Sequence, residues 1–291
     1  HKFGVKQRAF FKKFGAPHIL QMSATPIPRS MAIAFFGEFD VSIIDELPKG
    51  RLPIQTKIIS STEEKKLKPR ILEKIRKNQK LFVVTPLIQE SESLDEVQSV
   101  LHAYEEIQLL YPELEGKIGL LHGKMKPKEK EEAMRNFKSG KTMILVATTV
   151  IEVGVDVPEA TVMIIKNAER FGLAQLHQLR GRVGRGDKQS YAVLVANPKT
   201  DSGKDRMRIM TETTNGFVLA EEDLKMRGSG EIFGTKQSGL PEFHVADIIE
   251  DFPILEEARK VASYISSLPN WREDPEWHIV ALHLEKKEYL D

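Results

Sequence analysis

The residues best suited to chemistry gather in the segment 175–186, which reads QLHQLRGRVGRG. Arginine is always charged and offers a planar fork of N–H donors that fits phosphate oxygens, while glycine lets the backbone approach a ligand closely. A lone RGR tripeptide would be typical of a solvated surface loop. With Gln178 and Arg185 at this spacing, the segment instead indicates a phosphate-binding site.

A second segment, 147–158, reads ATTVIEVGVDVP and begins where an apolar run ends. It offers two hydroxyls, Thr148 and Thr149, followed by Gly154 and the carboxylate of Asp156. Ligands of parallel sheets lie beyond the carboxyl ends of the strands, so we expect the segment to occupy such an end. Taken alone, the threonines are typical of an ordinary turn and Asp156 of an ordinary loop.

Three shorter motifs also follow apolar runs. They are Ser23-Ala24-Thr25-Pro26, Thr85-Pro86 and Leu121-His122-Gly123. The hydroxyls of Ser23 and Thr25 can switch hydrogen-bond partners at small cost, although a helix entry followed by proline explains the same residues. A lone histidine beside glycine, such as His122, is usually a turn residue. No two histidines have metal-ligand spacing, so the sequence predicts no metal site.

The elements that must position these residues alternate between strand and helix. Runs rich in Val, Ile and Leu alternate with helical periodicity between residues 55 and 197, which predicts an α/β fold: a parallel sheet with helices on both faces. The predicted strands are 55–60, 81–85, 118–121, 143–147, 161–165 and 191–195, and the predicted helices are 63–77, 93–110, 127–137 and 172–180.

The same pattern divides the chain into parts. Residues 1–47 hold a strand, a helix and a strand, which is too little for a free-standing α/β domain and indicates the remnant of one. Prolines and a glycine mark 48–54 as a linker before the domain 55–197. A mostly helical extension follows, with a segment at 198–245 and a C-terminal helical segment at 246–291, and with helices predicted at 204–213, 217–226 and 251–267.

Composition narrows the class of protein. Hydrophobic residues make up 41% and charged residues 29% of the chain, and no apolar run reaches the roughly 18 residues of a membrane span. The absence of cysteine excludes disulfides and thiolate metal sites, and it fits a cytoplasmic location without membrane contact. The net charge of +1 does not by itself indicate a nucleic-acid partner. No acidic residue precedes Glu38, however, and this basic start is compatible with contact to a nucleic-acid backbone. A start at His1 without a leader favours a fragment.

The arginine-rich segment resembles the last motif of the superfamily 2 helicases, Q-x-x-G-R-x-x-R, through Gln178, Gly181, Arg182 and Arg185. The resemblance implies a RecA-like fold, with Arg182 and Arg185 as arginine fingers that a second RecA-like domain presents to ATP held on the first. Gln178 would orient these groups or the attacking water. Arginine fingers are worth about 10³ to 10⁵ in rate in well-studied nucleotidases.

The other motifs resemble further helicase motifs. Segment 147–158 resembles motif V, which implies that Thr148 and Thr149 contact nucleic-acid phosphate and that Gly154 and Asp156 lie at the nucleotide. The segment 23–26 resembles motif III, the link between ATP state and nucleic-acid grip, which implies a coupling role for Ser23 and Thr25. Thr85 and His122 lie in segments that resemble the remaining nucleic-acid-contacting motifs. Residues 1–47 would then be the end of the first RecA-like domain.

Two more segments resemble the RecG fork-remodelling helicases. The start, HKFGVKQR, resembles the sequence that follows their D-E-x-H box. Residues 224–239, LKMRGSGEIFGTKQSG, resemble the translocation motif shared with the transcription-repair coupling translocase, with Arg227 and Gln237 at its functional positions. The resemblance runs over essentially the whole chain. It implies an ATP-dependent double-stranded-DNA translocase, monomeric and nucleoid-associated, that reverses stalled forks and migrates branched DNA junctions.

Departures from that pattern leave alternatives open. The chain has no G-x-x-x-x-G-K-[ST] phosphate loop, so we expect ATP and Mg²⁺ to bind the intact protein and this fragment to be inactive alone. One alternative is the transcription-repair coupling translocase, although the FGVKQR start and the ending soon after the translocation motif favour RecG. Another is an inert nucleic-acid-binding module on a RecA-like scaffold, against which the intact motifs argue. A phosphate loop upstream of His1 would favour the ATP-driven motor over the inert binding module.

Overall fold

The chain forms two compact units, one of residues 1–26 with 44–226 and the other of residues 27–43 with 227–291. Within them, the computed structural model describes residues 20, 22, 42–44, 46, 50–86, 94–149, 156–227 and 251–288, without the side chains of 94–96, 227, 252 and 285–288. The domain boundaries drawn from the sequence stay a prediction.

The first unit is built on a six-stranded sheet in which every pair of neighbours is parallel. The strand order is β1-β6-β5-β2-β4-β3. Its central strands are apolar runs buried on both faces, as parallel sheets require. All six strands predicted within residues 55–197 are confirmed. They are β1 Gln55–Ile59, β2 Lys80–Val84, β3 Ile118–Leu121, β4 Ile144–Ala147, β5 Ala160–Lys166 and β6 Tyr191–Val195. The two strands predicted within residues 1–47 lie partly outside the described residues, and the described residues 20, 22 and 42–44 are not in strands.

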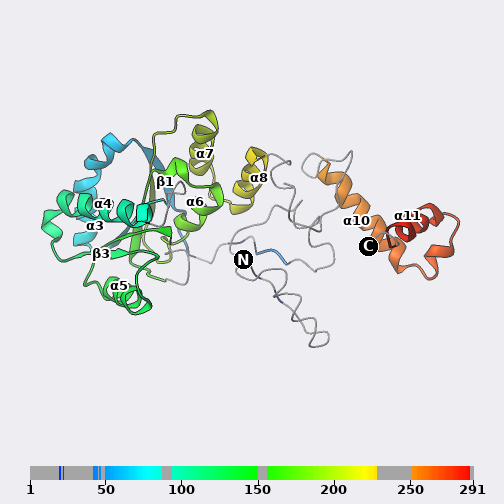
Figure 1. Ribbon diagram of the computed structural model, residues 1–291, viewed down its shortest axis with the longest axis horizontal. Coiled ribbons are helices and arrows are strands. Elements are labelled where there is room, and N and C mark those ends of the chain that lie inside the picture. The colour runs from blue at the N-terminus through cyan, green and yellow to red at the C-terminus, as the bar shows by residue number, and fades with distance from the viewer. Residues whose placement is uncertain are drawn as a thin grey trace. The chain divides into compact units, whose positions relative to one another are not determined.

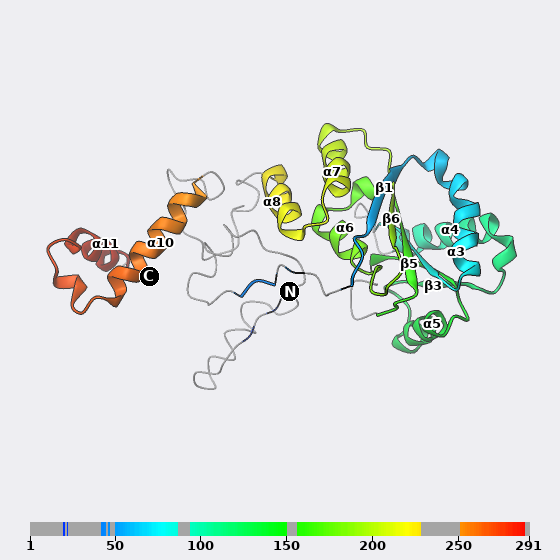
Figure 2. The ribbon, with the colours of Figure 1, turned by 180° about the vertical axis from the view of Figure 1, so that it is seen from behind.

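Helices cover both faces of this sheet, as predicted (Figures 1 and 2). Alternate strand residues point to opposite faces, so Val83 and Ile144 pack with α3 and α4, while Phe82 and Leu145 pack with α5 to α8. The two hydrophobic cores therefore lie on either side of one sheet. The helices are α3 Lys68–Arg76, α4 Leu94–Leu110, α5 Pro127–Ser139, α6 Leu173–Arg180, α7 Asp201–Glu212 and α8 Gly216–Arg227.

The structure divides one of the predicted helices into two elements. The sequence predicted a single helix over 63–77, whereas a 3-10 helix, Ser61–Leu67, precedes α3. Pro69 lies at the start of α3, and a proline has no N–H to continue the hydrogen bonds of a preceding helix. Its fixed backbone angle suits the first turn of a new helix instead.

The described part of the second unit is helical. It comprises α10, Phe252–Ser267, a 3-10 turn at Trp271–Glu273, and α11, His278–Glu288. The first helix agrees with the predicted 251–267. The second helix, α11, lies within the helical segment predicted at 246–291, but no separate range was predicted for it, because its sequence HIVALHLEKKE places an apolar block before a charged block and forms no helical stripe. No helix in the described parts of the chain is long and apolar enough to cross a membrane.

Candidate nucleotide and nucleic-acid site

Thr85, His122 and Thr148 lie together at the carboxyl edge of the sheet. Each directly follows one of three neighbouring strands, β2, β3 and β4. The backbone N–H of Thr85 donates to Ala147 O at 3.0 Å, and that of Thr148 donates to Leu121 O at 3.2 Å. The structure thus gathers three residues that the sequence assigned separately to the nucleic-acid side. Thr149 follows, half-buried.

The polar atoms of this edge are buried without partners. Thr85 is 2% exposed and Thr148 is fully buried. The Oγ1 atoms of both threonines and Nδ1 of His122 have no hydrogen-bond partner among the residues that the structure describes. An unsatisfied buried polar atom costs about 1 to 3 kcal/mol, so three of them in one place indicate an edge built to receive a partner.

The arginine-rich segment begins as the last turn of α6. Leu176 and Leu179 are fully buried against the sheet, while Gln178 is half-buried. The N–H of Gly181 still donates to His177 O at 3.0 Å, and the chain then leaves the helix. Residues 181–190 form the loop that leads to β6, which we name the arginine loop.

Arg180 is a structural residue. It is 2% exposed, and its Nη1 donates to the carbonyls of Met210 and Thr213, both at 2.9 Å. Met210 lies in the last turn of α7, whose carbonyls lack partners within the helix, so Arg180 caps that helix end. Burial lowers the pKa of Arg180 to about 10. Burial, together with the Arg180 charge, lowers the pKa of His177 to about 4.

Arg185 is held much more loosely. Its side chain is 33% exposed, and its Nη1 lies 3.5 Å from Oδ1 of Asp156, which is 66% exposed. Its Nε lies 3.5 Å from Gly181 O. An exposed ion pair at that distance contributes about 0 to 1 kcal/mol, so a phosphate can displace the carboxylate at small cost. Arg182 is half-buried beside it.

The structure corrects one expectation about segment 147–158. Thr148 lies at the carboxyl edge as expected, but Asp156 lies just before the amino end of β5. The arginine loop comes to the same amino edge, because a Cβ on Gly186 would lie 3.0 Å from Pro158 O. Strands β4 and β5 run in the same direction, so Thr148 and Asp156 lie at opposite edges of the sheet. The predicted nucleic-acid and nucleotide residues therefore occupy opposite edges.

Several predicted residues cannot be placed. Ser23, Thr25, Gly154 and Gln237 lie outside the described residues. Arg227 is the last residue of α8, with its side chain outside the description. Their roles stay predictions.

The structure draws attention to lysines that the sequence interpretation left out. Lys124, Lys126 and Lys128 are exposed directly after His122, between β3 and the first turn of α5. The Lys130 ammonium donates to Gly123 O. Closely spaced cations beside a proposed nucleic-acid edge suit a phosphate backbone. The signal was present in the sequence as KMKPKEK.

Residues 140–142 read GKT but do not form a phosphate loop. Arg135 stands where that motif needs its first glycine. A phosphate loop runs from a strand into a helix. Here the order is reversed, because α5 ends at Gly140, with φ of 82°, and β4 follows.

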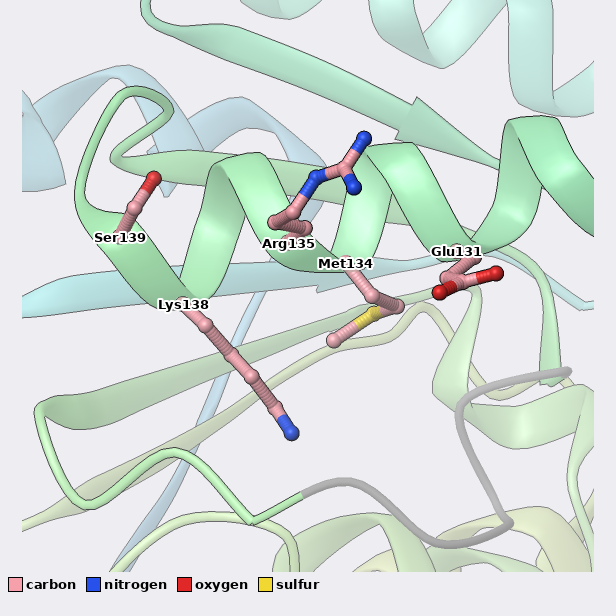
Figure 3. A pocket seen from close by; sticks show the side chains of 5 residues that line it. All are labelled: Glu131, Met134, Arg135, Lys138 and Ser139. Carbon is pink, nitrogen blue, oxygen red and sulfur yellow. The ribbon is translucent and has the colours of Figure 1, made fainter.

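An open pocket lies along α5, away from the residues assigned above (Figure 3). It is lined by Glu131, Met134, Arg135, Lys138 and Ser139, all on one helix. We assign it no role, since no polar groups from other elements converge on it. In the described part of the chain, no cluster of His, Asp and Glu could hold a metal ion.

Two families match the chain. Residues 65–187 match the helicase conserved C-terminal domain, and residues 213–289 match ATP-dependent DNA helicase RecG, domain 3, C-terminal. The chain is 65% identical over 292 residues to ATP-dependent DNA helicase RecG of Streptococcus pneumoniae, covering 100% of this chain and 43% of that protein. It is 52% identical over 264 residues to ATP-dependent DNA helicase RecG of Staphylococcus aureus, covering 90% of this chain and 38% of that protein.

A solved structure of RecG bound to a three-way DNA junction matches the fold. Its TM-score is 0.63 at 46% identity, over 81% of this chain and 30% of that chain. The fold is therefore the expected RecA-like α/β fold. The chain spans 43% and 38% of the lengths of the two relatives above. On these matches the chain belongs to the RecG family of DNA helicases, of which it is a C-terminal portion.

Proposed function

We propose that this chain supplies the second motor domain and translocation motif of an ATP-dependent double-stranded-DNA translocase. The intact protein would reverse stalled forks and migrate branched junctions in the cytoplasm, associated with the nucleoid and as a monomer. Branched DNA as the partner is supported by the related RecG structure, which is bound to a three-way junction. The match to RecG domain 3 over 213–289 favours this function over transcription-repair coupling.

The observation that carries the proposal is the contrast between two arginines five residues apart. Arg180 is buried and donates to two protein carbonyls at 2.9 Å, whereas Arg185 is exposed and held by two contacts of 3.5 Å. Protein stability explains the first arginine and does not explain the second. A solvent-facing guanidinium with a weak carboxylate partner is suited to exchange that partner for phosphate.

ATP and Mg²⁺ would bind to a phosphate loop supplied from outside this chain. The bound nucleotide would supply the phosphoryl group, and the chain's own part is positive charge. Arg182 and Arg185 would face the phosphates, and Arg185 would leave Asp156 as it does so. Phosphoryl transfer is stabilised mainly by positioned charge of this kind. Gln178, on the preceding turn of α6, would orient the arginines or the attacking water.

The opposite edge would hold the DNA. Thr85, His122 and Thr148 present unsatisfied polar atoms there, and the exposed lysines from 124 to 128 add positive charge. Thr148 at this edge and Asp156 at the other edge are close in the sequence, so the residues between them would couple DNA contact to the nucleotide. Arg227 and Gln237 would convert the resulting domain motion into translocation.

Replacing Arg182 with alanine in the full-length protein that carries this chain tests the proposal. We expect DNA-stimulated ATP hydrolysis to fall by about 10³-fold or more, because one charge that stabilises the transition state is lost. Binding to a fluorescent three-way junction should stay within about twofold, since Arg182 is assigned to the nucleotide edge. An Arg182→Ala protein that hydrolyses ATP at the wild-type rate would contradict the assignment. An inert binding module would show no hydrolysis even as wild type.

A further inference from the structure

The segment that precedes β1 is fastened to the arginine loop. Arg51 Nε donates to Gly184 O at 2.8 Å, across 133 residues of sequence. Gln189 Nε2 donates to Pro53 O at 2.8 Å, and Gln55 N donates to Ser190 O at 3.0 Å. Three hydrogen bonds therefore join residues 51–55 to the loop, and two of them come from side chains.

The fit at Gly184 leaves the loop little freedom. Gly184 has φ of 72°, a left-handed conformation that suits glycine. A Cβ at this position would lie 2.9 Å from Cγ1 of Ile54, which is closer than real Cβ atoms come to a neighbour. The backbone of the loop is thus seated directly on the segment that Arg51 begins.

The Arg51 hydrogen bond controls the peptide that carries Arg185. The Gly184 carbonyl and the Arg185 N–H belong to one planar peptide unit. The 2.8 Å hydrogen bond from Arg51 restrains that carbonyl oxygen, and so restrains the peptide unit that leads to the Arg185 Cα. The side chain of Arg185 makes two contacts of 3.5 Å, which cannot set its position as firmly.

We propose that Arg51 is a positioning residue for the Arg185 finger, and that it ties the interdomain linker to the nucleotide edge. This inference rests on the proposed function, in which 48–54 is the linker and Arg185 acts on ATP. Arg51 touches neither ATP nor DNA in this account. It sets the place from which Arg185 reaches the phosphates, so a change in the path of the linker would move the finger.

The test is Arg51→Ala in the full-length protein, with DNA-stimulated ATP hydrolysis as the first readout. We expect kcat to fall by about 10- to 100-fold, because a misplacement of about 1 Å at a catalytic group costs up to that factor. KM for ATP and Kd for a three-way junction should stay within about twofold. Hydrogen exchange of a peptide covering 181–190 should become faster in the variant. Unchanged kcat or unchanged exchange would overturn the inference.

Arg206→Ala is the matched control. Arg206 is also a half-buried arginine that donates to two loop carbonyls, those of Glu169 and Phe171, at 3.1 and 3.2 Å. Its loss should lower the melting temperature about as much as Arg51→Ala does, yet leave kcat near wild type. If both variants lose kcat alike, the effect is general destabilisation and the inference is wrong.

A double variant tests whether Arg51 acts through the finger. In an Arg185→Ala background, measured in single turnovers with excess enzyme, Arg51→Ala should lower the rate no further. Multiplied losses would contradict the inference. If Arg51→Ala fails to fold, Arg51→Lys replaces it. Its ammonium lies one atom further along the side chain, so we expect a rate about three- to tenfold below wild type, and a wild-type rate would count against positioning.

The outcomes separate the two proposals. A wild type that hydrolyses ATP on DNA, an inactive Arg185→Ala and a fully active Arg51→Ala would leave the proposed function standing and remove the inference alone. A fully active Arg185→Ala would remove the proposed function, and the inference with it.

Discussion

Replacing Arg180 with methionine should destabilise the chain without touching the nucleotide chemistry directly. Methionine keeps much of the arginine volume but has no donor, so the carbonyls of Met210 and Thr213 lose the Nη1 atom that lies 2.9 Å from each. Hydrogen bonds from charged groups contribute about 1.5 to 3 kcal/mol each, which gives about 3 to 6 kcal/mol for the pair. Removing a buried charge returns part of this amount. We therefore expect a net loss of about 3 kcal/mol.

Urea unfolding followed by far-ultraviolet circular dichroism measures this loss. Arg208→Met is the control, because Arg208 lies on α7 as well but is 59% exposed and pairs with Glu212 across one helical turn. Such an exposed pair contributes little to stability, so we expect a much smaller loss in this control. An Arg180→Met variant within about 1 kcal/mol of wild type would refute the view that this arginine caps α7. Equal losses in the two variants would refute it as well.

Two further predictions concern stability and DNA binding. Thr148→Val should leave the free energy of unfolding unchanged or higher, because it removes a buried hydroxyl that has no partner among the described residues, while fluorescence anisotropy should show about five- to tenfold weaker binding to a forked duplex. Unchanged DNA binding would contradict the edge assignment. His177 has a folded pKa of about 4, below its unfolded value of about 6.5, so its neutral form stabilises the fold above pH 6.5 and this stability is lost as the pH falls towards 4. Between pH 7 and 5 wild type should lose about 1 kcal/mol more than His177→Asn, after allowance for the partial exposure of the ring, and equal losses would contradict the cause given for the shift.

The sheet could be predicted because its strands obey a simple rule. Strands such as β2, KLFVV, and β5, ATVMIIK, are buried on both faces, so burial alone demands continuous apolar runs with polar ends. The helices followed from periodicity, except where the stripe was absent, as in α11, or where Pro69 started a new helix.

The sequence predicted the roles of the residues in the candidate site only in part. The motif spacing assigned Arg182 and Arg185 to the nucleotide and left the neighbouring Arg180 without a role. Only the tertiary contacts of Arg180 to Met210 and Thr213 show that it caps a helix, while Arg185 stays exposed. The placement of Thr148 and Asp156 at opposite edges of the sheet also escaped prediction, since the end of one strand does not show where the residues before the next strand lie.

Long-range contacts were the least accessible from sequence. In the sequence, Arg51 is part of a polar linker between prolines. Nothing in the composition of this linker predicts a contact with Gly184, which lies 133 residues away. The hydroxyls of Thr85 and Thr148, which have no partner within the described part of the chain, could also not be predicted from the sequence, because a threonine after a strand normally pairs with the adjacent backbone.

The assignment of Arg185 to the ATP site is tested by the rate of DNA-stimulated ATP hydrolysis of an Arg185→Ala variant of the full-length protein. We expect this rate to fall by about 10³-fold or more, with junction binding and thermal stability close to wild type, because Arg185 is exposed and its Asp156 contact is weak. Arg208→Ala, which removes an exposed arginine on α7, should hydrolyse ATP normally. Hydrolysis by Arg185→Ala at the wild-type rate would contradict the claim that this loop forms half of the ATP site.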